Sequence, residues 1–522
     1  MSVRRRSTDA PHDGGAPRAP GTTAVAGATR GADAEVSHWW SAAGPRPTRR
    51  PLPGGRDADV CIVGAGFTGL WTAYHLARAR PGLRIVVLEA HHVGYGASGR
   101  NGGWLTAELA GSRERLAGRH GRDAVVAVQR AMQDTVRSVL DVCATEGIAC
   151  DQHLGGTLEI ARNRAQERRL REAVAEDRTF GLGEDDARML EADEVARRVR
   201  VDGARAARFS PHCARIDPAR LVLGLAAAVE RHGVTIHEDT RVRRIVGANR
   251  GDVGAGVAGS ANGNGPDPAG DLGSGRNARA VTDRGNVRAP CVLRCTEGFT
   301  ADLPGERRTW LPLNSSIVIT ERLEAEAWER IGWRGAETLG DAAHAYLYAQ
   351  RTADGRIALG GRGVPYRLGS RHDDGGDTPD RTVRHLTEAL RAWFPPARDV
   401  PIADAWSGVL AVPRDWAPTV ALDRAAGVGW AGGYVGTGVA ASELAGRTLR
   451  DLVLGEETPL TRLPWVRERP RRWEPEPLRW LAVNAVYAMY RAADRREDAR
   501  SGASDADRDS RLARVADRVA GR

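Results

Sequence analysis

Short apolar runs alternate with helical patterns in three separated parts of the chain. Apolar runs at 59–63 and 84–88 predict buried parallel strands, and residues 67–80 between them predict a helix that ends at Pro81-Gly82. Two later parts repeat the alternation, with a helix over 221–232 before a strand near 234–237, and a strand over 428–431 before a helix over 439–454. Because this alternation is typical of parallel sheets, we expect a Rossmann-like α/β domain with helices on both faces of its sheet.

A different pattern separates these parts. Residues 119–144 predict one long helix, and alternating segments predict strands of a second, antiparallel sheet at 157–161, 316–320, 345–350 and 356–360. The fold class is therefore α/β with an inserted α+β domain. We assign 37–112, 205–304 and 401–458 to the Rossmann-like domain, and 113–204 and 305–400 to the inserted domain.

Three segments have a composition unlike the rest. Residues 1–36 are small and polar without periodicity and predict a disordered tail. Residues 247–276 hold ten glycines and predict a flexible insertion in a hairpin of the strands 241–246 and 278–283. Residues 459–522 predict a helical extension with a basic tail. Its helix at 477–493 has an apolar face, which we expect to dock on the body or on a second subunit rather than on a membrane surface.

The strongest chemical signal is the pattern Gly64-x-Gly66-x-x-Gly69, directly after the strand at 59–63. Gly64 permits a tight turn, Gly66 lets a pyrophosphate approach the backbone, and Gly69 lets the following helix pack closely on the strand. Glu89 follows the second strand, where a carboxylate accepts hydrogen bonds from ribose hydroxyls. The pattern predicts binding of NAD or FAD; the alternative is an ordinary strand–helix turn with a surface glutamate.

Two further glycine-rich segments favour FAD over NAD. Residues 94–103 form a loop of small residues where an NAD-binding domain would continue with another strand and helix, and such a loop suits a large flat ligand. Residues 432–439 open a second helix, whose dipole would stabilise the negative charge near N1 and C2=O of a reduced flavin. Alone, this second segment is equally consistent with a glycine turn before a helix.

With these motifs, the sequence resembles the glycine/D-amino-acid-oxidase-like (DAO) family of FAD-dependent oxidoreductases, and most closely its gamma-glutamylputrescine oxidoreductase type. The matching stretches follow the family's order and span about 37–455. They are residues 37–40, 59–69, 96–103, 215–218, 356–361, 406–409, 415–418 and 432–439.

The resemblance implies the residues that contact FAD. It implies that the phosphates and ribose are bound by Gly64, Gly66, Thr68, Gly69 and Glu89, and that the flavin lies beside Ser98, Arg100, Asn101, Gly102 and Gly103. It further implies that Val242 contacts the adenine end. The pyrimidine edge of the flavin should face Gly433, Gly436, Thr437, Gly438 and Val439. We expect noncovalent FAD, because Arg100 stands where some members attach the flavin through histidine.

The chain departs from the family in two respects. Many members read Val-Leu-Ala-Thr-Asn-Ala after a β-strand, where this chain has Leu293-Arg-Cys-Thr-Glu-Gly298. Sarcosine-oxidase-like members use a lysine near the flavin to help oxygen react, and this chain contains no lysine. An arginine or an ordered water would then assist oxygen, or the electrons would pass to another acceptor.

The resemblance implies oxidation of a C–N bond in an amine or amino acid. Hydride passes to flavin N5, and the resulting imine hydrolyses. Tyr346 and Tyr348 on one strand, with Trp406, are candidates for contact with substrate, and Arg351 or Arg362 could bind a carboxylate. The alternative for the tyrosines is a half-buried position in the sheet, and for His344 a surface position at a strand end.

Charge and cysteine usage exclude other classes. Residues 1–58 and 461–522 carry the whole net charge of +9, so residues 59–460 are neutral overall. A neutral folded region argues against nucleic-acid binding. No apolar run is long enough to cross a membrane, and the N-terminus lacks a secretory signal. Six dispersed cysteines without zinc spacing predict no metal site, no disulfide framework and a cytoplasmic setting.

Two other functions stay open at this point. An NAD-linked dehydrogenase is disfavoured by the second glycine-rich helix start. A flavin-binding or basic-tailed interaction protein without turnover is disfavoured by the neutral body and by the complete series of flavin motifs.

Overall fold

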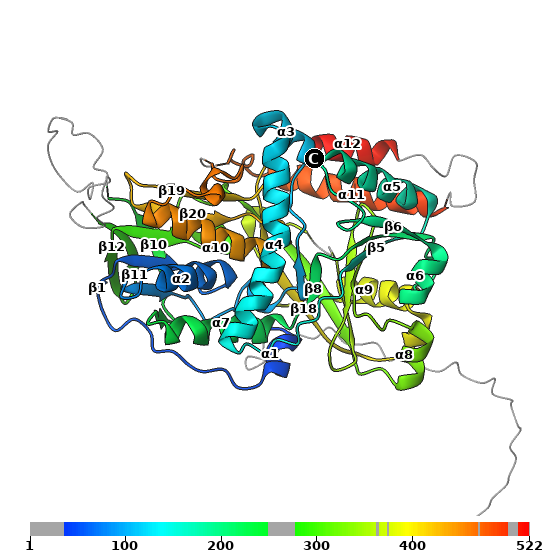
Figure 1. Cartoon of the computed structure of the whole chain (residues 1–522), viewed down its shortest axis with the longest axis horizontal. Coiled ribbons are helices and arrows are strands. Elements are labelled where there is room, and N and C mark those ends of the chain that lie inside the picture. The colour runs from blue at the N-terminus through cyan, green and yellow to red at the C-terminus, as the bar shows by residue number, and fades with distance from the viewer. Residues whose placement is uncertain are drawn as a thin grey trace, which may run out of the picture.

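A six-stranded sheet lies at the left of Figure 1 and carries both glycine turns. The computed structural model describes residues 36–248, 277–361, 365–372, 375–467, 470–499 and 510–520. Five strands are parallel and the edge strand β19 is antiparallel. In spatial order they are β19 Thr419–Asp423, β20 Val428–Gly432, β13 Cys291–Arg294, β2 Val60–Val63, β3 Ile85–Leu88 and β9 Thr235–His237.

Helices cover one face of this sheet. Val60, Ile62 and Val87 point into a core that the helices share, and α10 packs directly on α2. The apolar faces of all four helices are buried here, which explains their 3.6-residue periodicity in the sequence. These helices are α2 Phe67–Ala79, α4 Arg122–Glu146, α7 Pro218–Arg231 and α10 Gly438–Leu454.

The expectation of helices on both faces is wrong. A four-stranded sheet covers the second face, where Cys61, Val63 and Val86 pack against it. A strand buried on both faces reads as apolar throughout whether a helix or a sheet covers it, so the sequence pattern could not separate the two. The small sheet has the order β1 Arg56–Asp57, β12 Gly285–Ala289, β11 Ala278–Thr282 and β10 Val242–Val246.

The predicted hairpin of two strands is confirmed, because β10 and β11 pair antiparallel. The insertion predicted over 247–276 lies outside the described residues except for Gly247 and Ala248, and so does the predicted tail except for Val36.

An eight-stranded sheet forms the other half of the molecule. It is antiparallel, as predicted, except where β5 runs parallel to β15. One of its faces packs on helix α9 Asp380–Trp393, around Trp393 and Leu390. In spatial order the strands are β18 Ile402–Val412, β14 Leu311–Thr320, β17 Ile357–Gly361, β16 Leu347–Arg351, β15 Thr338–Asp341, β5 Thr157–Ala161, β7 Ala206–Ser210 and β6 Arg188–Glu191.

The division between the two halves differs from the predicted boundaries at three elements. Strands β7 and β18 pair in the eight-stranded sheet, although the sequence assigned 205–304 and 401–458 to the Rossmann-like domain. Helix α4 was assigned to the inserted domain, yet its Val128, Met132 and Val136 lie in the core with α2 and α10. Burial depends on the partner of an apolar face, which local periodicity does not identify.

The C-terminal extension folds back onto the body. Helix α11 buries Val483 and Tyr487 beside Trp416 and Trp473, and α12 packs on α11. The predicted docking on the body is thus observed (Figure 1). The remaining elements are α1 His38–Ala43, β4 Trp104–Thr106, α3 Arg113–His120, α5 Arg164–Thr179, α6 Ala192–Arg198, β8 Cys213–Arg215, α8 Ala325–Ile331, α9 Asp380–Trp393, α11 Leu478–Ala499 and α12 Arg511–Ala520.

All six cysteines are buried and free. Among the described helices, none has the length and apolarity needed to span a bilayer.

Close packing of α10 on α2 depends on Gly446. A Cβ at this position would lie 2.8 Å from the backbone carbon of Trp71. We expect Gly446→Ala to lower the free energy of unfolding by about 1–3 kcal/mol through overpacking. Gly118→Ala in α3 is the matched control, because its Cβ would meet no atom within 4 Å. Thermal denaturation followed by circular dichroism compares them; equal midpoints would contradict this packing.

Candidate active site

Both glycine turns line one cavity of about 680 Å³, which extends from the parallel sheet to the eight-stranded sheet. The first turn lies at the end of β2 and the second after β20, and the order β20-β13-β2 brings these strand ends to the same edge. Predicted cofactor residues that line the cavity are Gly64, Gly66, Thr68, Glu89, Ser98, Arg100, Asn101, Gly102, Val242, Gly436, Thr437, Gly438 and Val439.

The first turn has the close approaches that its glycines predict. Gly64 has a φ of 105°, and a Cβ there would lie 2.5 Å from the carbonyl oxygen of Cys295. A Cβ on Gly69 would lie 2.0 Å from the Gly64 carbonyl oxygen, so this glycine serves helix packing and does not line the cavity. The N–H of Ala65 donates to Glu89 at 2.8 Å, which joins the ends of β2 and β3.

Two indole rings donate hydrogen bonds to the backbone of the 94–103 loop. Trp39 donates to the carbonyl of Asn101 and Trp406 to the carbonyl of Arg100, both at 2.9 Å. Ser98 Oγ accepts the N–H of Phe67 at 2.8 Å, which ties the loop to the start of α2. These bonds fix the backbone of the loop along the cavity wall.

Two polar side chains stabilise this loop from within. Arg100 is 3 % exposed, and its Nε donates to the carbonyl of Tyr95 while the guanidinium lies 4.5 Å from the Tyr95 ring centroid. Asn101 Oδ1 accepts the N–H of Gly103 at 2.8 Å. A Cβ on Gly103 would collide with Gln350 and the Ile216 carbonyl, so this glycine shapes the loop without lining the cavity.

The second turn is fixed by Glu297, which together with Arg294 makes the 293–298 segment differ from the family's usual sequence. Its carboxylate accepts the N–H groups of Gly433 at 2.9 Å and Tyr434 at 3.3 Å, and that of Ala411 in β18 at 3.1 Å. Burial raises the pKa of Glu297 to about 7 despite these donors. Gly433 therefore serves the turn and does not line the cavity.

Arg294, the other unusual residue, also has a structural role. Its guanidinium pairs with Glu306 at 2.7 Å and lies 4.9 Å from the ring centroid of Trp310. It is 5 % exposed and does not line the cavity.

Tyr346 and Tyr348 line the part of the cavity next to the eight-stranded sheet. Their rings lie 6.0 Å apart, and the hydroxyl of Tyr348 lies 3.2 Å from Ser315 Oγ. A Cβ on Gly102 would lie 2.6 Å from the ring of Tyr348, so this tyrosine adjoins the 98–103 loop. Tyr346, directly before β16, and Tyr348 within β16 thus place two aromatic rings between the loop and the outer part of the cavity.

Two expected substrate residues do not line the cavity, and we correct their assignment. Arg351 lies three residues after Tyr348 on β16, so its side chain points to the opposite face of the sheet. There it stacks on Trp328 and donates to the carbonyl of Trp333. Trp406 is fully buried beneath the loop that it supports. Arg362 lies outside the described residues.

Several cavity residues were not identified as substrate contacts from the sequence. Glu108 and Glu159 are isolated acids without a motif, and Tyr487 and Tyr490 lie on the C-terminal helix α11. His344 lines the cavity and bonds to Glu497 at 3.0 Å, so it is not a free surface residue. Only the fold brings these five side chains to one cavity.

Residues 59–452 match the family described as DAO, FAD dependent oxidoreductase. The match covers most of the chain and includes both glycine turns. The chain belongs to the DAO family of FAD-dependent oxidoreductases. The resemblance stated from the sequence is thereby confirmed.

Curated relatives of this DAO protein cover nearly the same range. It is 27 % identical over 401 residues to gamma-glutamylputrescine oxidoreductase of Escherichia coli (strain K12), which covers 76 % of this chain and 84 % of the relative. It is 27 % identical over 424 residues to the probable oxidoreductase OrdL of Rhizobium meliloti, with coverage of 81 % and 89 %.

Solved structures show the same fold. Glycine oxidase from Geobacillus kaustophilus has a TM-score of 0.59 at 20 % identity and covers 80 % of this chain and 99 % of its own. L-amino acid deaminase from Proteus vulgaris has a TM-score of 0.60 at 17 % identity, with coverage of 81 % and 99 %.

The residues present fit FAD. The first turn offers helix N–H groups to a diphosphate, and Gly66 lines the cavity at this point. A Cβ on Gly66 would also lie 2.9 Å from Ser98 Oγ, so there is little room for a side chain here. The second helix start, at Gly436–Val439, lines the same cavity and would offer a positive dipole to the pyrimidine edge of a flavin.

We expect Gly66→Val to abolish retention of FAD, because its branched Cβ would occupy the space of the diphosphate. The measurement is the ratio of flavin to protein absorbance after purification. Gly54→Ala is the control, because a Cβ at Gly54 meets no atom within 4 Å. Full flavin content in Gly66→Val would contradict the placement of the diphosphate.

Proposed function

We propose that this DAO protein oxidises a C–N bond of an amine or amino acid, with noncovalently bound FAD as its cofactor. The observation that carries this proposal is the single cavity that joins two flavin-type glycine turns to an aromatic pocket at Tyr346 and Tyr348. The names of related proteins support it, since they include gamma-glutamylputrescine oxidoreductase, glycine oxidase and L-amino acid deaminase.

The chain would hold FAD through three groups of residues. The start of α2 at Gly66–Thr68 binds the diphosphate, and Glu89 binds the ribose hydroxyls. The start of α10 at Gly438 faces the pyrimidine edge, where its dipole stabilises negative charge. When bound, FAD supplies the acceptor for the hydride of the substrate.

The protein residues orient the amine and exclude water. A neutral amine lies with its α carbon toward the 98–103 loop, and the rings of Tyr346 and Tyr348 enclose its chain. Loss of a hydride from the α carbon and of a proton from nitrogen leaves an imine. Water then hydrolyses the imine to an aldehyde or keto acid and releases the nitrogen as ammonia or an amine. The two electrons pass to oxygen or to another acceptor.

The two alternatives make different spectroscopic predictions. An NAD-linked dehydrogenase would be purified without flavin, and an interaction protein would hold a flavin that no amine reduces. The shared cavity argues against NAD, because a second glycine turn at Gly436–Val439 has no function in a simple NAD site. The aromatic pocket argues against a protein without a substrate.

We expect the purified protein to show flavin bands near 450 nm that bleach when an amine substrate is added without oxygen. The experiment is a screen of monoamines, diamines and amino acids by absorbance, repeated with oxygen to separate an oxidase from a dehydrogenase. Bands that no member of the panel bleaches would count against the catalytic assignment, and a colourless protein that binds NAD would replace it.

We expect acid precipitation to release the flavin into the supernatant, because Arg100 offers no nucleophile for attachment. The measurement is the absorbance of supernatant and pellet after precipitation. Flavin that stays with the pellet would show a covalent bond.

A further inference from the structure

The C-terminal helix α11 lies outside the matched family range, which ends at residue 452, yet it lines the cavity. Tyr487 and Tyr490 face the outer part of the cavity, with exposures of 8 % and 2 %. Their rings meet edge to face at 6.1 Å. The extension therefore adds two aromatic rings to a site that the family domain only partly encloses.

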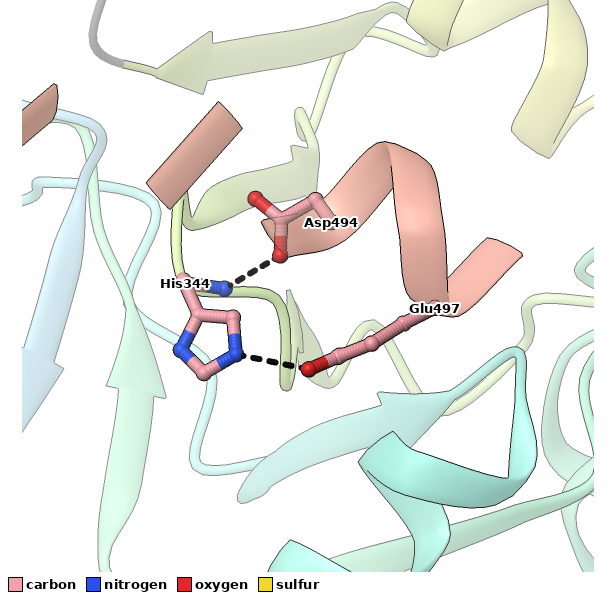
Figure 2. A group of neighbouring side chains, drawn as sticks. All are labelled: His344, Asp494 and Glu497. Carbon is pink, nitrogen blue, oxygen red and sulfur yellow. Dashed lines mark hydrogen bonds and ion pairs between the residues drawn. The ribbon is translucent and has the colours of Figure 1, made fainter. Parts of the chain in front are cut away.

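A polar cluster holds α11 against this cavity (Figure 2). His344 Nε2 lies 3.0 Å from Glu497, while the backbone N–H groups of His344 and Ala345 both donate to Asp494 at 2.9 Å. The ring of His344 stacks on Tyr490 at 5.8 Å. The cluster thus fixes the helix relative to the segment that leads into Tyr346.

This cluster has the residue types of a metal site, but a neighbouring arginine shows that it holds protein segments together instead. Arg169 of α5 donates to Glu497 at 2.9 Å and lies 3.2 Å from His344 Nε2. A guanidinium between these groups supplies the positive charge that a metal ion would otherwise supply. The three elements α5, α11 and the 342–346 segment are thereby joined at the outer end of the cavity.

Two carboxylates line the cavity near Tyr346. Glu108 and Glu159 both lie close enough to Tyr346 to raise the pKa of its hydroxyl, after burial as the main cause. Glu159 pairs with Arg208 at 3.0 Å, and Arg208 also pairs with Asp177. Among the residues that the structure describes, the side chain of Glu108 has no hydrogen bond or ion pair, although it faces the cavity. Burial first and Glu159 second raise the pKa of Glu108 to about 7.

The arginines of the cavity are already engaged. Arg169 bonds to Glu497 and to the carbonyl of Ala342. Arg100 bonds within the flavin loop, and Arg241 lies beside His91 near the ribose end. The outer end thus presents a carboxylate and aromatic faces, which is the chemistry that binds an alkylammonium ion.

We propose that Glu108, Tyr487 and Tyr490 bind a second ammonium group of the substrate, remote from the carbon that is oxidised. The inference rests on the proposed function and narrows the substrate class to diamines and longer polyamines. Helix α11 is then a specificity element: it supplies aromatic faces, Glu108 supplies the opposite charge, and the chain between the two nitrogens lies along Tyr346 and Tyr348.

The test compares 1,4-diaminobutane with pentylamine, a monoamine of similar length, by anaerobic flavin reduction over a range of concentrations. We expect the wild-type protein to reach half of its limiting reduction rate at a concentration of 1,4-diaminobutane that is about tenfold lower than that of pentylamine. Glu108→Gln should raise that concentration about tenfold for the diamine only, with the limiting rate nearly unchanged. Glu184→Gln, at an exposed site, is the matched control.

The tyrosine is tested by a pair of variants. Tyr487→Leu should raise the half-saturating diamine concentration about fivefold by removing a cation–π contact, whereas Tyr487→Phe keeps the ring and should resemble wild type. Flavin content and thermal midpoint are measured for every variant, so that loss of folding is recognised.

The possible failures are distinguishable. If no amine reduces the flavin, the proposed function fails. If amines reduce it but wild type does not prefer the diamine, or if Glu108→Gln affects both amines equally, this inference alone is overturned. A lower limiting rate with an altered pH profile in Glu108→Gln would instead place Glu108 at the reacting nitrogen and also overturn it.

Discussion

The arrangement of this site depends on one carboxylate that joins three parts of the fold. Glu297 follows β13 and accepts backbone N–H groups from Gly433 and Tyr434 in the second glycine turn and from Ala411 in β18. The parallel sheet, the start of α10 and the edge of the eight-stranded sheet thereby meet at one side chain. Without these bonds, three backbone donors would lack their acceptor, at a cost of about 1–3 kcal/mol each.

The rest of the cavity is built on the same principle, in which distant segments are fixed by hydrogen bonds to backbone. Trp39 near the start of the described chain and Trp406 in β18 both donate to carbonyls of the 98–103 loop. Ser98 ties this loop to α2, and Glu89 ties the first turn to β3. A flat ligand would thus meet walls that are ordered before it binds, which lowers the entropic cost of binding.

The two ends of the cavity differ in origin as well as in chemistry. The end that holds the two glycine turns lies within the matched family range and is lined by glycines, two helix starts and Glu89. The outer end combines Glu108 from the family domain with tyrosines from a helix beyond that range. Under the proposed function, this division would separate the part that binds the cofactor from the part that distinguishes substrates. The polar cluster around His344 holds α11 at the outer end.

Local sequence determined the nucleotide end of this protein, because a glycine turn between a strand and a helix is a contact between neighbours in the chain. The motif at Gly64–Gly69, the acid at Glu89 and the helix start at Gly436–Val439 could all be placed before the fold was known. Tertiary structure decided what covers the second face of the parallel sheet, which half β7 and β18 join, and which side chains line the outer cavity. Arg351 and Trp406 face away from the outer cavity. Glu108 and Tyr487 both face into the cavity, although these two residues lie far apart in sequence. Such contacts depend on how whole elements pack, and no local pattern of residues specifies that packing.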